Sequence, residues 1–262
     1  MAEVVGSDSA QPLRHVAVIM DGNNRWAKAR GLAGHEGHRA GVERVRDMIE
    51  SCQRHHVEVV TLFAFSSENW QRPALEVSAL MTLFSTYIKK EAKALHERGI
   101  RLQVIGERGR FSSRLQKRIA DAEALTINNT AMTLVLAVDY GGRRDIVVAS
   151  RKLAQQVVDG ALAVEDIDEE LFEKNLSLAD LPQPDLCIRT AGEQRISNFL
   201  LWQLAYSELY FAECYWPDFD AAAFDTAAAA YYQRQRRFGL SQDQTATDVD
   251  QTAKSAQARV SA

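Results

Sequence analysis

Cysteine is scarce in this sequence, and it contains no recognisable targeting or membrane-spanning segment. The three cysteines, Cys52, Cys187 and Cys214, form neither a CxxC pair nor a zinc-binding Cys/His spacing. The longest strongly apolar run, Ala131 to Val138, is far too short to cross a bilayer. The N-terminus lacks a basic start followed by an apolar stretch. These absences predict a soluble protein of a reducing compartment, the cytoplasm.

An excess of positive charge is also lacking. The formal net charge of −4 argues against nucleic-acid binding through a broad basic surface, although a local arginine cluster around a small anion remains allowed. Residues 1–13 and 241–262 are mostly small and polar, without apolar periodicity, and are predicted to be disordered. Residues 14–240 are then expected to form one domain, because no Pro/Gly-rich linker interrupts them.

Short apolar runs alternate with amphipathic segments throughout this domain. We expect six mostly buried strands, at Val16–Met20, Val57–Phe65, Ile100–Ile105, Met132–Val138, Leu186–Arg189 and Leu209–Phe211. The clearest helical spacing runs from Leu80 to Leu95, and Gly99 is placed to end that helix. The alternation predicts an α/β fold with a mostly parallel six-stranded sheet and helices on both faces. Ligands should bind at the carboxyl ends of the strands.

The first strand runs into a turn that suits an anion. Asp21 and Gly22 are followed by the start of a predicted helix, whose free backbone N–H groups favour a phosphate. A carboxylate beside a phosphate suggests an intervening Mg²⁺ ion, which makes Asp21 a metal candidate. A simple helix cap, or an aspartyl nucleophile of a phosphatase, remains an alternative at this point. His38 is interpreted as a further phosphate donor at a helix start, and a solvated loop histidine is the alternative.

Two more strands end in polar turns. The second strand leads into Ser66, followed by Asn69, Trp70 and Arg72, which together offer proton relays, an apolar wall and an anion donor. The alternative is that Ser67 or Asn69 caps a helix and that Trp70 packs in the core. The fifth strand ends at Arg189, after which a small turn leads to Arg195 and Ser197, predicted to open a helix. This arrangement suits a diphosphate, whereas Glu208 is either a second metal carboxylate or an arginine partner.

Taken together, these segments resemble the cis-prenyltransferase family, whose members make cis-polyprenyl diphosphates. The resemblance spans about Arg14 to Gly239 and rests on HVAVIMDGNNRWA, GHRAG, FAFSSENWQRP, IRTAGEQRISNFLLWQ, YSELYF and WPDF in that order. It implies a Mg²⁺-dependent homodimer that adds isopentenyl diphosphate to an allylic primer such as farnesyl diphosphate. The expected product is undecaprenyl diphosphate, the lipid carrier precursor for cell-wall polysaccharide, released with transient membrane contact.

The resemblance also implies roles for individual residues. Asp21 would bind metal and act in catalysis, Glu208 would share the metal, and Asn69 would lie near the departing proton. The allylic diphosphate and primer would be held by Gly22, Asn23, Asn24, Arg25, Trp26, His38, Ser66, Ser67, Glu68, Trp70 and Arg72. Isopentenyl diphosphate would be held by Arg189, Arg195, Ile196 and Ser197, and a mobile lid is expected around Arg72–Glu76.

Four positions depart from the commonest family pattern: Asn24 where many members have Gly, Gly34 where an Arg often precedes the GH pair, Ala191 in place of Gly or Ser, and Gln194 in place of a His found in some members. Gly34 puts one diphosphate contact in doubt, with Arg30 or His35 as candidate substitutes, and Gln194 leaves the metal with fewer protein ligands.

The growing chain requires an apolar tunnel. We expect its walls to include Leu80, Leu83, Phe84, Met132 and Leu134, for which ordinary core packing is the alternative. The competing functions are a synthase of different product length, a non-catalytic partner subunit of the same fold, and a Mg²⁺-dependent phosphatase.

Overall fold

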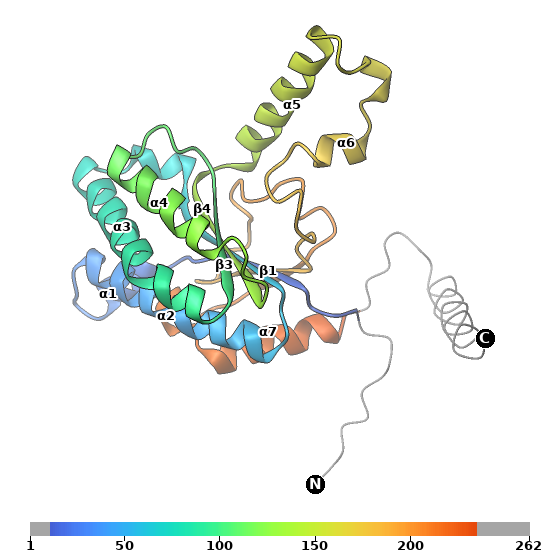
Figure 1. The fold of residues 1–262 in the computed structure, drawn as a ribbon. Helices are drawn as coiled ribbons and strands as arrows, with labels where there is room; N and C mark the ends of the chain where they lie inside the picture. The colour runs from blue at the N-terminus through green and yellow to red at the C-terminus, as the bar shows by residue number, and fades with distance from the viewer. Residues whose placement is uncertain (1–10, 235–262) are drawn as a thin grey trace.

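The computed structural model describes residues 11–234, in which six strands form one parallel sheet (Figure 1). The strands are β1 (His15–Ile19), β2 (Val59–Ser66), β3 (Ile100–Ile105), β4 (Met132–Tyr140), β5 (Leu186–Arg189) and β6 (Glu208–Phe211). The α-helices are α1 (Asn23–Ala29), α2 (Gly34–Arg54), α3 (Ala74–Glu97), α4 (Ser113–Thr126), α5 (Gly142–Val158), α6 (Glu169–Glu173) and α7 (Ala221–Tyr232). The 3-10 turns are η1 (Ser67–Gln71), η2 (Val164–Asp166) and η3 (Trp216–Asp218). The six predicted strands and the α/β class are confirmed.

The strand order β3-β4-β2-β1-β5-β6 places β1 between β2 and β5. Ile19, at the end of β1, is paired with Phe63 of β2 and with Arg189 of β5. Because all pairings are parallel, the turns that follow these three strands leave the same edge of the sheet. The three polar turns predicted from the sequence are therefore brought together by the sheet order.

One face of the sheet carries the larger core, beneath α2, α3, α4 and α7. Alternate residues of β1 divide between the two faces, with Val16 and Val18 in this core and Ala17 and Ile19 in the core opposite. Gly99 directly follows the C-cap residue of α3 and has a φ of 68°, which fits its predicted role as a helix stop. This face holds the helices that surround the predicted tunnel.

The opposite face is packed largely by turn-rich chain from 176 to 204. The helix predicted to open at Arg195 and Ser197 is wrong, because residues 191–207 contain no helix. Ser197, Asn198 and Leu200 have φ angles of 46°, 62° and 41°, which a right-handed helix cannot accommodate. The apolar residues of this segment instead bury themselves as an irregular layer, with Phe199 and Leu200 fully inaccessible.

The ends of the domain differ slightly from the predicted boundaries. Leu13, assigned to the disordered N-terminal segment, is 2% exposed and belongs to the larger core. Residues 1–10 and 241–262 of the predicted disordered ends lie outside the described residues, as does the domain boundary at 240. Within residues 11–234 no helix is long and apolar enough to cross a membrane.

Candidate active site

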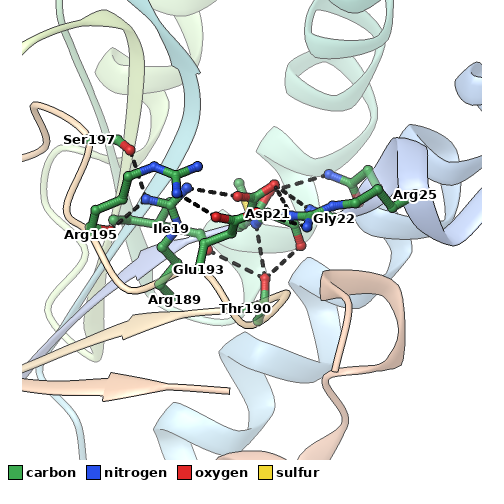
Figure 2. A network of polar contacts seen from close by, with 11 residues as sticks. Ile19, Asp21, Gly22, Arg25, Arg189, Thr190, Glu193, Arg195 and Ser197 are labelled. Carbon is green, nitrogen blue, oxygen red and sulfur yellow. Dashed lines mark hydrogen bonds and ion pairs between the residues drawn. The ribbon is translucent and has the colours of Figure 1, made fainter. Parts of the chain in front are cut away.

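The Asp21 carboxylate lies between two arginines at the carboxyl edge of the sheet (Figure 2). Its Oδ2 accepts a hydrogen bond of 2.8 Å from Nη2 of Arg189, and its Oδ1 lies 3.3 Å from Nη2 of Arg25. The Gly22 N–H also donates to Oδ1 at 2.6 Å. Residues 168 positions apart in sequence therefore meet, as the anion-site hypothesis requires.

These contacts determine the ionisation of Asp21. Burial pushes the pKa of Asp21 upward, but the hydrogen bond and charge of Arg189, together with Arg25 and the Gly22 N–H, outweigh it. The pKa of Asp21 is therefore held below its usual value, and the carboxylate is charged at neutral pH. A charged carboxylate with 29% of its side chain exposed is accessible to a cation.

The turn after Asp21 requires glycine. Gly22 has a φ of 99°, and an added Cβ would lie 2.6 Å from the Tyr215 ring and 2.9 Å from Cβ of Ala191. The backbone of this turn is fixed further by Thr190, whose Oγ1 accepts from the Asp21 N–H and donates to the Asp21 carbonyl. The short helix α1 then begins at Asn23 and presents Asn24, Arg25 and Trp26.

Arg189 is the buried centre of the third turn, with 5% of its side chain exposed. Its Nη1 donates to Oγ of Ser197 at 2.7 Å and to the carbonyl of Arg195 at 2.5 Å, so the guanidinium holds this turn against Asp21. The Arg195 side chain is 59% exposed and pairs with Glu193, which also binds Arg25. Ile196 packs against the smaller core instead of facing Asp21.

The second turn is a capping box. The Ser66 side chain accepts from the Asn69 backbone, and Oδ1 of Asn69 accepts from the Ser66 N–H at 3.0 Å. The Asn69 amide thus caps this turn, as the capping alternative expected of it, although the N-cap residue is Ser66 and not Ser67. Asn69 also lines an apolar cavity that adjoins the turn. Glu68 accepts from Nδ2 of Asn198 at 2.8 Å, and this bond ties the second turn to the third. Ser67 lies beside the same junction, because a Cβ on Gly141 would contact both its Oγ and Asn198.

Trp70 and Arg72 form the outer part of the second turn. The Trp70 ring packs edge-on against Phe65 with centroids 5.4 Å apart, and the guanidinium of Arg110 covers it at 4.7 Å. Arg72 pairs with Glu76 at 3.0 Å, across the segment where the lid was predicted.

An apolar cavity of about 160 Å³ opens beside these turns, between α2, α3, β2 and β4. Its polar lining comprises Asn23, His38, Asn69 and Arg72. Oδ1 of Asn23 and Nε2 of His38 are buried without a hydrogen-bond partner in the described part of the chain. Unpaired buried polar atoms are costly, so two of them on residues that line one cavity indicate a polar ligand.

His38 does not precede the helix as predicted but lies one turn inside α2, which begins at Gly34. Burial lowers the pKa of His38, and the nearby charge of Arg72 lowers it further, against an opposing effect of Glu76. His38 is therefore a neutral imidazole at neutral pH, and its orientation toward the cavity is fixed by helix packing and not by a loop.

The tunnel prediction is partly confirmed. Leu80, Leu83 and Phe84 line the cavity, together with the β4 residues Leu136 and Val138. Met132 and Leu134 do not line it; they lie deeper along the same face of β4, within the larger core. The prediction selected the right strand and face but residues too far from the mouth.

Glu208 is not brought to Asp21 within one chain. It begins β6, where it is aligned with Leu186 at the amino end of β5, three residues before the level of Arg189. At about 3.3 Å per residue, that offset alone is about 10 Å along the strand. Its carboxylate pairs instead with Arg234 at 2.8 Å, because both lie at the opposite edge of the sheet. The alternative of an arginine partner is the one the structure supports.

Three residues of the site were not identified from the sequence as functional. Thr190 and Asn198 supply the bonds that join the turns, and Glu193 bridges Arg25 and Arg195. Each lies within the segment IRTAGEQRISNFLLWQ, so membership of that motif is the feature of the sequence that could have identified them as functional. Their partners are remote in sequence, and only folding identifies them.

The site suits a hard cation only when a ligand supplies further oxygens. Asp21 contributes a charged carboxylate and Asn23 an unpaired amide oxygen, both of which are donors that Mg²⁺ prefers. Residues 11–234 contain no cluster of three or more His, Cys, Asp or Glu placed to hold a metal. A Mg²⁺ ion here would take most of its ligands from water and a bound phosphate.

An edge site with a charged carboxylate, a buried arginine and an adjoining apolar cavity defines an anion-binding α/β protein. The family model described as putative undecaprenyl diphosphate synthase matches residues 19–239, and the chain belongs to this family. The ditrans,polycis-undecaprenyl-diphosphate synthase of Pseudomonas aeruginosa, named as (2E,6E)-farnesyl-diphosphate specific, is 57% identical over 236 residues, covering 90% of this chain and 94% of the relative. The Escherichia coli K12 enzyme of the same name is 52% identical, over 88% of this chain and 91% of the relative.

Solved structures agree with this assignment. Lavandulyl diphosphate synthase from Lavandula x intermedia, in complex with dimethylallyl diphosphate, matches with a TM-score of 0.84 at 41% identity, over 86% of this chain and 98% of that chain. A probable undecaprenyl diphosphate synthase from Campylobacter jejuni matches with a TM-score of 0.72 at 31% identity, over 87% and 99%. The resemblance of the chain to the cis-prenyltransferases is thereby confirmed.

Proposed function

We propose that this chain is a Mg²⁺-dependent cis-prenyltransferase that adds isopentenyl diphosphate to farnesyl diphosphate and forms undecaprenyl diphosphate. The names of the relatives support farnesyl diphosphate as the primer and undecaprenyl diphosphate as the product. The observation that carries the proposal is the 2.8 Å contact between Asp21 and Arg189 beside an apolar cavity with unpaired polar atoms on residues that line it. A diphosphate with an isoprenoid tail matches both parts of such a site.

The two diphosphates are assigned to different turns. The primer diphosphate takes the N–H groups and side chains of residues 22–26 together with His38, because Asn23 and His38 line the cavity and residues 23–26 form the first turn of α1. Isopentenyl diphosphate takes Arg195 and Ser197, whose positions are set by Arg189. Asp21 lies between the two groups, where a cation would relieve their mutual repulsion. Asp21 and the unpaired oxygen of Asn23 are the residues that would hold Mg²⁺ there, and Glu208 is left out of this set.

Bound Mg²⁺ would offset charge on the departing diphosphate. The arginines serve the same purpose, since preorganised donors stabilise the transition state more than the ground state. Breaking the primer C1–O bond leaves an allylic carbon with positive character, which the isopentenyl double bond attacks before a proton is lost. Oδ1 of Asn69 already accepts one hydrogen bond and its Nδ2 can only donate, so Asn69 orients this step and a diphosphate oxygen takes the proton.

Chain growth requires the cavity to enlarge. Its volume of about 160 Å³ is below the roughly 300–1,000 Å³ of pockets that enclose drug-sized ligands. Each added unit gains up to about 0.8 kcal/mol per buried CH₂, which favours displacement of the α3 wall over leaving the tail in water. The Arg72–Glu76 pair at the start of α3 is the predicted lid, and its opening would accompany that movement.

The test is incubation of purified protein with Mg²⁺, farnesyl diphosphate and radiolabelled isopentenyl diphosphate, followed by sizing of the extracted lipid. We expect label in a long polyprenyl product, with nearly all turnover lost in Asp21→Ala and retained in Asp121→Ala, an exposed carboxylate on α4. Release of free phosphate without labelled lipid would identify a phosphatase instead. Inactivity of the wild-type chain alone would favour a non-catalytic partner subunit, and a lipid of another size would correct only the product length.

Homodimerisation and a cytoplasmic location with transient membrane contact at product release also belong to the proposal. The resemblance to the family supports the homodimer. Exposed apolar side chains on α5, which projects from the body in Figure 1, offer a surface for it: Val147, Val148 and Val158 are 47%, 37% and 80% exposed.

A further inference from the structure

A second and larger pocket of about 650 Å³ lies between α3 and α4, on the outer side of α3. Its α3 wall carries Ser78, Thr82 and Ser85, which recur at intervals of four and three residues and so share one helix face. Leu80 and Phe84, which line the inner cavity, lie on another face. The two spaces are therefore separated by α3 and share only Arg72 and Met81 among their lining residues.

The charge of this outer pocket is of one sign. Its lining contains the four arginines Arg72, Arg110, Arg114 and Arg118 and no aspartate or glutamate. Two of them are neutralised nearby, since Arg72 pairs with Glu76 and Arg110 with the buried Asp139. Arg118 donates to the hydroxyl of Ser85 at 2.5 Å, and neither it nor Arg114 has an ion-pair partner among residues 11–234. Two uncompensated positive charges thus remain in a concave site of a protein whose net charge is negative.

The remaining lining is apolar. Val77, Phe111 and Leu115 belong to the larger core, and Trp70 and Met81 pack against it, so the floor of the pocket is the outer boundary of that core. The volume is far more than a bare phosphate needs. Arginines at the rim and an apolar floor are complementary to an amphiphile with an anionic head.

We propose that the α3–α4 pocket binds a phosphate group carried on an apolar chain, at a site separate from Asp21. Arg114 and Arg118 hold the phosphate, and the hydroxyls of Ser78 and Ser85 donate further hydrogen bonds to it. The apolar chain lies against Val77, Phe111 and Leu115. A free prenyl phosphate and a phospholipid headgroup share this chemistry, and the experiment separates these two sources.

The probe is n-octyl phosphate, titrated calorimetrically into the full-length protein without Mg²⁺. We expect Arg114→Gln/Arg118→Gln to weaken binding by about tenfold or more, because charge-assisted bonds to phosphate are lost. The matched control is Lys93→Gln/Lys117→Gln, which removes the same charge from exposed positions on α3 and α4 outside the pocket and should bind like wild type. Circular dichroism and turnover of the arginine variant should be unchanged, since neither residue contacts the Asp21 site.

Vesicle flotation then identifies the source. The pocket takes a lipid headgroup if the wild type floats with phosphatidylglycerol vesicles but not with phosphatidylcholine vesicles, and if the arginine variant floats with neither. Binding of octyl phosphate without flotation indicates a free amphiphile. Equal octyl phosphate binding by the wild type and both double variants would overturn the proposal. Binding that is lost in Arg189→Gln but kept in Arg114→Gln/Arg118→Gln would also overturn it, because it would place the ligand at the Asp21 site. Failure of lipid synthesis in the wild type would refute the proposed function and leave these binding results standing.

Discussion

Asn24 and Gly34, two of the four departures from the family pattern, pack against each other. A Cβ on Gly34 would lie 2.0 Å from Oδ1 of Asn24, so a larger residue at position 34 requires the Asn24 amide to move. Neither substitute considered for the missing arginine is free to replace it. Arg30 binds Asp218 at 3.1 Å and stacks on Trp26, and His35 pairs with Glu36. The two departures therefore act as one coupled change.

We predict that Asn24→Gly/Gly34→Arg lowers the KM for farnesyl diphosphate by about tenfold, since one charge-assisted hydrogen bond contributes about 1.5–3 kcal/mol. Gly34→Arg alone should give less than half of that gain in free energy, because the Asn24 side chain occupies the required space. Steady-state kinetics of both single variants and the double variant form the test. Strictly additive effects would contradict the coupling.

His38 offers a second test at the scale of single residues. Burial and the charge of Arg72 lower its pKa, so a bound diphosphate, which supplies negative charge, should raise it. We predict an upward shift in the NMR titration of the His38 ring when inorganic diphosphate is added. Arg72→Gln should raise the pKa of His38 in the free protein, whereas Arg143→Gln, an exposed arginine of α5, should leave it unchanged. An unaltered titration in the presence of saturating diphosphate would remove His38 from the site.

Among the elements, β4 determines how far the cavity extends. Leu136 and Val138 line it, and Leu134 and Met132 continue the same face toward the amino end of the strand. Residues of the opposite face, such as Val135, belong to the other core. Because α3 forms the wall facing β4, the length of an enclosed chain is limited by how far the space extends along these β4 residues toward Met132.

We predict that Met132→Ala lengthens the polyprenyl product, because it opens space at the inner end of that row. Val135→Ala is the control, since it removes fully buried volume from the opposite face and should leave product length unchanged. Each variant should lose stability, by about 2–5 kcal/mol for Met132→Ala. Thin-layer chromatography measures the product lengths. Equal lengths for the wild type and Met132→Ala would show that Met132 serves only core packing.

For the molecule as a whole, His15 links stability to pH. It is fully buried, with Nδ1 2.6 Å from the carbonyl oxygen of Pro182 and Nε2 2.8 Å from Oγ1 of Thr61. Burial lowers its pKa to about 4, from an ordinary value of 6.5. Between these two values the unfolded chain binds a proton that the native protein does not, so stability falls as the pH is lowered through this window.

The expected loss is about 3 kcal/mol between pH 6.5 and 4, at 1.36 kcal/mol for each unit of pKa. Urea unfolding at several pH values measures it, and His15→Gln should remove this part of the pH dependence. His96→Gln, at the end of α3, should retain it. A wild-type stability that is constant over this range would show that His15 is protonated in the native protein.

Association is the second prediction at this scale. If the apolar surface of α5 forms the homodimer, Val147→Asp should shift sedimentation from dimer to monomer, because a carboxylate is costly in an apolar interface. Lys93→Asp, an exposed position on α3 outside this surface, should remain dimeric. A wild-type chain that sediments as a monomer would refute the homodimer.

The sequence by itself determined the strands, the parallel sheet and the polar turns, because buried strands have continuous apolar runs and abrupt polar ends. It also indicated Asp21, Arg189 and the α3 wall of the cavity, since these lie in short motifs with local signatures. Tertiary structure alone decided that the FLLWQ segment is not helical, because left-handed residues and packing on the sheet override its apolar spacing. It likewise separated Glu208 from Asp21 and joined Asn198 to Glu68, since strand register and contacts between distant turns are set only when the sheet is assembled.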